Sequence, residues 1–197
     1  VFNYTILAAQ TDASGISIAA NALSLNSGTL ADAAGNNATL THALVADNTG
    51  YLVETTSPTV TLSSAAYTSA TNTLVLTGTN FATLLETGET ASTDIKARLD
   101  WSKLSWDING DNAATADVSF ALGDISSAVV TDGTHLTVVL STAKGTALEA
   151  TAGFNNTGGN DNLDITAGFA KDVAGNAAST DAVANAALTI ITPTVAG

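Results

Sequence analysis

The sequence predicts an all-β protein built from antiparallel β-sandwich modules in tandem. Short runs of alternating apolar and polar residues are separated by turn signals, and only one stretch favours a helix. A short motif also occurs twice, as Asp32-Ala33-Ala34-Gly35-Asn36 and, 140 positions later, as Asp172-Val173-Ala174-Gly175-Asn176. A repeat at this spacing indicates whole domains and not the turns of a solenoid.

The two prolines, Pro58 and Pro193, also lie in similar contexts and set the expected module boundaries. We predict that residues 1–57 are the C-terminal part of one module, 58–192 a complete module and 193–197 the start of a third. Proline fixes its own φ and restricts the preceding residue to extended backbone, so residues 54–58 form a semi-stiff linker. The chain lacks an initiator methionine and a signal peptide, and we interpret it as a fragment of a longer protein.

Each expected element rests on local periodicity. In the first module, alternation predicts strands at residues 2–6, 16–18, 23–25, 38–42 and 51–53. In the second module it predicts strands at 60–62, 74–76, 118–120, 136–140, 163–165 and 188–190. Residues 94–106 fit a short helix or a bent strand, and we favour the strand. Residues 142–151 are rich in helix formers, and Ser141 or Thr142 is placed to cap a helix there.

The composition narrows the class of partner. The net charge is −13, with 18 acidic residues against five Lys and Arg, and cysteine is absent. Nucleic-acid binding requires a basic surface, so we expect no nucleic-acid partner. No run approaches the ~20 apolar residues of a membrane span, which argues against direct membrane insertion. A surplus of carboxylates does suit a divalent cation such as calcium.

Several motifs together resemble a known family. They are Gly15-Ile16-Ser17-Ile18, Leu23-Ser24-Leu25-Asn26-Ser27-Gly28, Asp32-Ala33-Ala34-Gly35-Asn36 and Thr55-Thr56-Ser57-Pro58-Thr59-Val60. This order of motifs resembles the immunoglobulin-like repeats of very large bacterial surface adhesins and related S-layer-like proteins. The resemblance implies immunoglobulin-like sandwiches, export to the cell surface, tandem stacking and often bound calcium. It implies no single ligand.

The strongest candidate for a calcium site is the stretch Asp107-Ile108-Asn109-Gly110-Asp111-Asn112. Oxygen ligands at its first, third and fifth positions, Asp107, Asn109 and Asp111, can point to one hard cation from a tight loop. The stretch lacks the bidentate Glu of an EF-hand, so Asp117, Asp124 or Asp100 would have to complete the shell. The alternative interpretation is a polar turn without metal.

The repeated motif has two interpretations of its own. Asp32 and Asp172 accept hydrogen bonds from local backbone in a structural turn, or they are calcium ligands near a module junction. The Gly-Gly-Asn-Asp-Asn run at 158–162 resembles one degraded calcium-binding repeat, and we interpret it as a polar loop because a single copy cannot stack.

Trp101 and Trp106 are five positions apart. Exposed and coplanar, they would form a sugar-stacking platform, and buried, they would anchor the core, which is the commoner fate of large aromatic side chains. No catalytic constellation with a positioned base can be assembled from the sequence, so we expect no enzymatic activity.

These observations favour a structural and adhesive repeat region of a secreted or cell-surface bacterial protein, an adhesin shaft stabilised by calcium. Its partners would be neighbouring modules of the same parent chain or other copies of it. An S-layer or extracellular filament subunit is one alternative. A carbohydrate-binding module that uses Trp101 and Trp106 on a surface glycan is the other.

Overall fold

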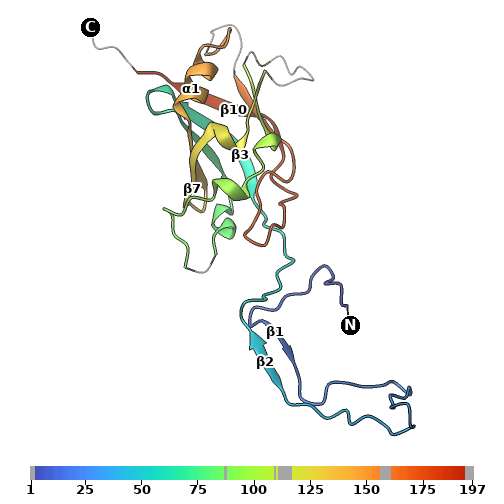
Figure 1. Cartoon of the computed structure of the whole chain (residues 1–197). Helices are drawn as coiled ribbons and strands as arrows, with labels where there is room; N and C mark the ends of the chain where they lie inside the picture. Colours follow the sequence, from blue (N-terminus) through green and yellow to red (C-terminus); the bar gives the residue numbers. More distant parts are fainter. Residues whose placement is uncertain (1–2, 87, 109, 111–116, 156–160, 194–197) are drawn as a thin grey trace. The chain divides into compact units, whose positions relative to one another are not determined.

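The structure is a computed structural model that describes residues 3–86, 88–108, 110, 117–155 and 161–193. The chain divides into two compact units, residues 1–56 and residues 57–197 (Figure 1). The division falls within the proline-containing linker, where extended backbone separates one set of local contacts from the next.

The smaller unit has little secondary structure. Its described residues form one two-stranded antiparallel sheet of β1 (Ile16–Ile18) and β2 (Val45–Asn48). Gly15 is the only buried residue among residues 3–56. The apolar side chains that the sequence assigns to strands are largely exposed: Tyr4 is 74% exposed and Ile6 is 48% exposed. A two-stranded sheet buries too little apolar surface to form an independent core.

The larger unit contains one sheet. In chain order, its strands in the described residues are β3 (Thr61–Thr68), β4 (Thr73–Thr79), β5 (Leu104–Asp107), β6 (Val118–Ser119), β7 (Ile125–Asp132), β8 (His135–Leu140), β9 (Asn162–Ile165) and β10 (Val183–Ile191). They are ordered β6-β5-β9-β10-β3-β4-β8-β7 across the sheet. Every neighbouring pair is antiparallel except β10 and β3, which are parallel.

The prediction of tandem antiparallel sandwich modules is therefore wrong, although the all-β class is confirmed. The reason is the length of β10, which pairs with β9 at its beginning and with β3 at its end. Asn185 interrupts the strand with a left-handed backbone (φ 56°) and donates its amide to Asp164 Oδ1 (2.7 Å). One strand thus joins two groups of strands into a single mixed, curled sheet.

The curl encloses one hydrophobic core. Alternate residues of β3, β4, β5, β7, β8 and β9 point inward, as the pleat requires. Tyr67 on β3 meets Trp106 on β5 edge to face, with ring centroids 5.3 Å apart, although β9 and β10 separate these strands in the sheet. Phe154 contacts both rings. Side chains from distant strands can touch in this way only because the sheet folds over on itself.

Two local predictions have different outcomes. The helix is confirmed as α1 (Thr142–Glu149), and its cap is Ser141, whose hydroxyl accepts the Lys144 amide (3.2 Å). The strand favoured for residues 94–106 is largely wrong, since only β5 at its end is a strand. The rest forms the short 3-10 turns η3 (Lys96–Arg98) and η4 (Trp101–Lys103). Across the described chain, no helix is long and apolar enough to cross a membrane.

Three further 3-10 turns complete the larger unit: η1 (Ser69–Thr71), η2 (Phe81–Leu84) and η5 (Leu122–Asp124). Phe81 and Leu84 in η2 are both buried, so this turn covers one end of the core.

Gly78 on β4 offers a direct test of this packing. A Cβ atom on Gly78 would lie 1.9 Å from the Thr61 carbonyl oxygen on β3, beside an irregularity in the strand pairing. We expect Gly78→Ala to lower the free energy of unfolding by about 1–3 kcal/mol, because backbone must move to admit the methyl group. Gly123→Ala is the matched control, since nothing lies within 4 Å of its Cβ position. Urea unfolding of both variants measures the difference, and equal stabilities would contradict the close approach.

The larger unit has a buried core and the smaller unit does not, and this difference predicts how each would behave as a separate fragment. Residues 1–57 expressed alone should be unfolded or aggregated, because the exposed apolar side chains leave no core to offset chain entropy. Residues 58–193 should fold cooperatively. Circular dichroism during heating distinguishes the two fragments. A cooperative transition from a monomeric 1–57 fragment would contradict this division of stability.

Candidate functional site

The predicted calcium stretch begins at the end of β5. Asp107 is 6% exposed, and its Oδ1 accepts a hydrogen bond from the Gly110 amide (2.8 Å). Asp117, just before β6, accepts the Ile108 amide at Oδ2 (2.9 Å). These two of the predicted ligands therefore organise the start of the β5–β6 connection. The other two, Asn109 and Asp111, lie outside the described residues.

A carboxylate that the sequence interpretation missed lies beside this stretch. Asp161 directly precedes β9, and the β5–β9 register pairs its neighbour Asn162 with Asp107. Asp161 is 4% exposed, and its Oδ2 accepts the Trp106 indole N–H (2.8 Å). Its Oδ1 is buried and has no hydrogen-bond partner in the described structure. The signal that could have found it is strand alternation, since residues 161, 163 and 165 share the buried face.

The surroundings of Asp161 disfavour its charged form. Burial has the largest effect on the pKa of the Asp161 carboxyl and raises it. Hydrogen bonding from Trp106 and from the Asn155 backbone lowers this pKa, and the charge of Asp107, a smaller effect, raises it. Among the described residues, no group of three or more acidic or histidine side chains is arranged to hold a metal ion. The structure therefore describes two buried carboxylates near one end of β5 and β9, with Asp161 on the buried face and Asp107 opposite Asn162.

Asp181 is a buried carboxylate whose two oxygens both accept hydrogen bonds from the protein backbone. It is fully buried, and its two oxygens accept the Gly168 amide (3.0 Å) and the Ala170 amide (2.7 Å). Those bonds hold the loop that leads into the second Asp-x-x-Gly-Asn motif. Both oxygens of Asp181 are thus paired with protein donors, which is the normal state of buried polar groups.

The repeated motif forms the same turn in both units. In each copy the Asp amide donates to the Asn carbonyl, and the Gly amide donates to the Asp carbonyl. The backbone amide of the Asn donates to Oδ1 of the Asp, at 2.9 Å in the first copy and 2.8 Å in the second. The side-chain amide of the Asn donates to Oδ2 of the same Asp, at 2.9 Å in both copies. Gly35 and Gly175 have φ of 88° and 87°, which favours glycine. Both oxygens of Asp32 and of Asp172 therefore serve the turn.

The hydrogen bonds also stabilise the ionised form of the first aspartate. The side chain of Asn36, followed by its amide, holds the pKa of Asp32 below its usual value. This geometry favours the structural interpretation of the motif over the calcium-ligand interpretation.

Both tryptophans are in the core. Trp101 is 2% exposed and Trp106 is fully buried, so neither presents a ring face to a sugar. The Trp101 indole donates to the Lys96 carbonyl (2.9 Å), and its ring meets Phe169 edge to face. The favoured interpretation of the two indoles as core residues is confirmed, and they anchor different parts of the same core.

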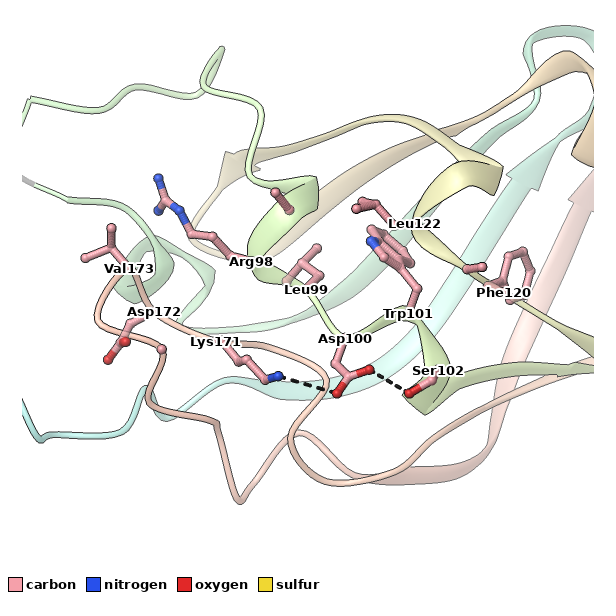
Figure 2. A pocket seen from close by; sticks show the side chains of 13 residues that line it. Arg98, Leu99, Asp100, Trp101, Ser102, Phe120, Leu122, Lys171, Asp172 and Val173 are labelled. Atoms are coloured by element: carbon pink, nitrogen blue, oxygen red, sulfur yellow. Dashed lines mark hydrogen bonds and ion pairs between the residues drawn. The ribbon is translucent and has the colours of Figure 1, made fainter.

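A pocket of about 650 Å³ lies beside Trp101 (Figure 2). Its apolar wall includes Leu99, Phe120 and Leu122, and its polar wall includes the pair Lys171–Asp100 (3.4 Å). Figure 2 shows these two side chains turned toward each other, with Asp100 also accepting the Ser102 hydroxyl (2.6 Å). The charges of Lys171 and Asp100 offset each other, and Arg98 and Asp172 also line the pocket.

Comparison of the chain with protein-family models, with curated proteins and with solved structures finds no match.

Asp172→Ala should lower the free energy of unfolding of the larger unit by about 1–2 kcal/mol, because the Asn176 amide and side chain each lose an acceptor. Asp172→Asn is the matched control, since it keeps one acceptor oxygen for the Asn176 amide. Thermal melts with calcium and with chelator give the measurement. A loss that appears only in calcium would show that Asp172 is a cation ligand and would contradict the structural interpretation.

Proposed function

We propose that this chain is part of the repetitive shaft of a secreted or cell-surface bacterial protein, in which modules act as spacers. The observation that carries the proposal is the Asp-x-x-Gly-Asn turn, which both units form with the same hydrogen bonds. Recurrence of one supersecondary element along a chain is typical of tandem repeat proteins, whose units contact mainly their neighbours. Adhesion would then be the task of other parts of the parent protein.

The net charge of the chain supports an extended array of modules. With a net charge of −13, neighbouring modules repel one another, which opposes collapse and keeps the chain soluble. In the larger unit the first strand, β3, lies beside the last strand, β10, and this pairing closes the core. The unit can therefore act as a rigid spacer. Bound calcium would stiffen such a spacer.

A lattice or filament subunit is the second candidate, and one observation favours it. Several large apolar side chains of residues 3–56 are exposed, including Ile16, Leu30, Leu44 and Tyr51. Large apolar side chains that stay exposed can supply a surface for contact with other protein where they lie together. In an S-layer or filament they would form contacts between copies.

Small-angle scattering and sedimentation of the full chain distinguish these candidates. A shaft segment should stay monomeric and elongated over a wide range of protein concentration, with and without calcium. Assembly that grows with protein concentration or on addition of calcium would contradict the spacer and favour the lattice subunit. A compact monomer would contradict both.

A further inference from the structure

We propose that residues 21–38 of the smaller unit form a docking face for a polypeptide segment of the same class as residues 58–140. Residues 58–140 are the part of the larger unit that holds β3 to β8. The proposal shares with the proposed function the premise that the chain repeats one kind of module. It goes further, because it names a surface of the smaller unit and the class of partner that this surface fits.

The first argument is an internal match that extends beyond the repeated turn. Residues 21–38 correspond to residues 161–178 at the same 140-residue spacing. Besides the turn itself, the matching pairs are Leu23 with Leu163, Leu25 with Ile165, Gly28 with Gly168 and Ala38 with Ala178. The two stretches are therefore copies of one segment in different surroundings.

The second argument is what covers this segment in the larger unit. Strand β9 pairs with β5 along its length. Beyond the strand, the Thr166 amide donates to the Lys103 carbonyl (2.9 Å), and the Asp100 amide donates to the Phe169 carbonyl (2.8 Å). The covering groups of β5 and of the turn before it all belong to residues 58–140. The larger unit thus shows which part of a module holds this segment in place.

The third argument is that the same positions are buried in one unit and exposed in the other. Leu163 and Ala170 are fully buried, whereas their counterparts Leu23 and Leu30 are 39% and 50% exposed. Residues 23–25 belong to no strand in the described smaller unit. A segment that pairs its backbone with an added strand and buries alternate side chains gains both affinity and specificity. Residues 23–25 can gain both from a partner that resembles β5.

The pairing within the larger unit also excludes a second copy of this chain as the occupant. Each copy has one segment 58–140, and its own β9 and β10 already pair with β5 and β3 of that segment. A connection within one chain gives these strands a high effective concentration, so they outcompete a segment from another molecule. The occupant is therefore a β3–β8 segment that has no β9 and β10 of its own.

Two positions show how the natural occupant differs from residues 58–140. Thr29 corresponds to Phe169, whose ring meets Trp101 edge to face with centroids 5.4 Å apart. Leu30 corresponds to the small residue Ala170. The smaller unit therefore has its large side chain one position later. Its natural occupant requires different side chains opposite these positions, while residues 58–140 serve as a probe of the class.

A second copy of residues 58–140, placed directly before Val1 of the full chain, tests the proposal. Residue 141 corresponds to residue 1 at the 140-residue spacing, so the extension meets the smaller unit in register. The calorimetric enthalpy of unfolding should roughly double, because it scales with the number of folded residues. Amide hydrogen exchange at residues 21–38 should slow, as it does for backbone that joins a folded unit. The unextended chain is the reference for both measurements.

Substitutions in the extended chain test the face itself. Leu23→Asp should remove both gains, because it places a charge where an apolar side chain must be buried. Leu44→Asp is the matched control and should keep both gains, since Leu44 is exposed but lies outside residues 21–38. Thr29→Phe combined with Leu30→Ala restores the pattern of the larger unit. This pair of changes should raise the melting temperature of the completed module.

Two results would overturn the proposal. One is the absence of both gains in the extended chain and also in its variant with Thr29→Phe and Leu30→Ala. The other is a gain that survives Leu23→Asp. Both leave the spacer function untouched, because scattering of the unextended chain tests it separately. If the unextended chain associated with rising concentration and protected residues 21–38, a second copy would be the occupant and the assignment to an unclosed β3–β8 segment would be wrong.

Discussion

Strand β10 hydrogen bonds to β9 through residues 183–187 and to β3 through residues 187–191, and the larger unit depends on this double pairing. Without it, the β6-β5-β9 and β3-β4-β8-β7 groups would be two separate sheets. The left-handed residue Asn185 lets the strand change direction between its two partners. The curl that results brings Tyr67 against Trp106 and closes the core. A single strand from the end of the chain thus controls the packing of strands that come far earlier in the sequence.

This constraint explains which parts of the fold could be predicted. The strands around Leu74, Leu136 and Leu163 follow from alternation, and α1 follows from its composition and the Ser141 cap. Sheet order does not follow, because the parallel pairing of β10 with β3 links residues more than a hundred positions apart. The 3-10 turns at 96–103 also escape prediction, since tertiary contacts of Trp101 and Leu99 decide their shape. Local pattern specifies elements, whereas long-range pairing specifies architecture.

The residues of the candidate site also divide into those that the sequence could predict and those that it could not. Ligand spacing predicts Asp107, and Asp117 is one of the acidic residues expected to complete the shell; the structure places both in the β5–β6 connection or at its start. The sequence motif at Asp161 predicts a polar loop, and the burial of this residue does not follow from that motif. Its alternation with Leu163 and Ile165 indicates an inward carboxylate, yet only the structure shows that one of its oxygens has no partner in the described chain. Trp101 and Trp106 illustrate the reverse case, in which a suggestive pair of residues belongs to the core.

A crystal structure of the full chain tests the central claim about β10 most directly. Residues 183–187 should pair with β9, and residues 187–191 should pair in parallel with β3, within one continuous sheet. Two separate sheets, or a β3 strand without β10 as its parallel neighbour, would contradict the account.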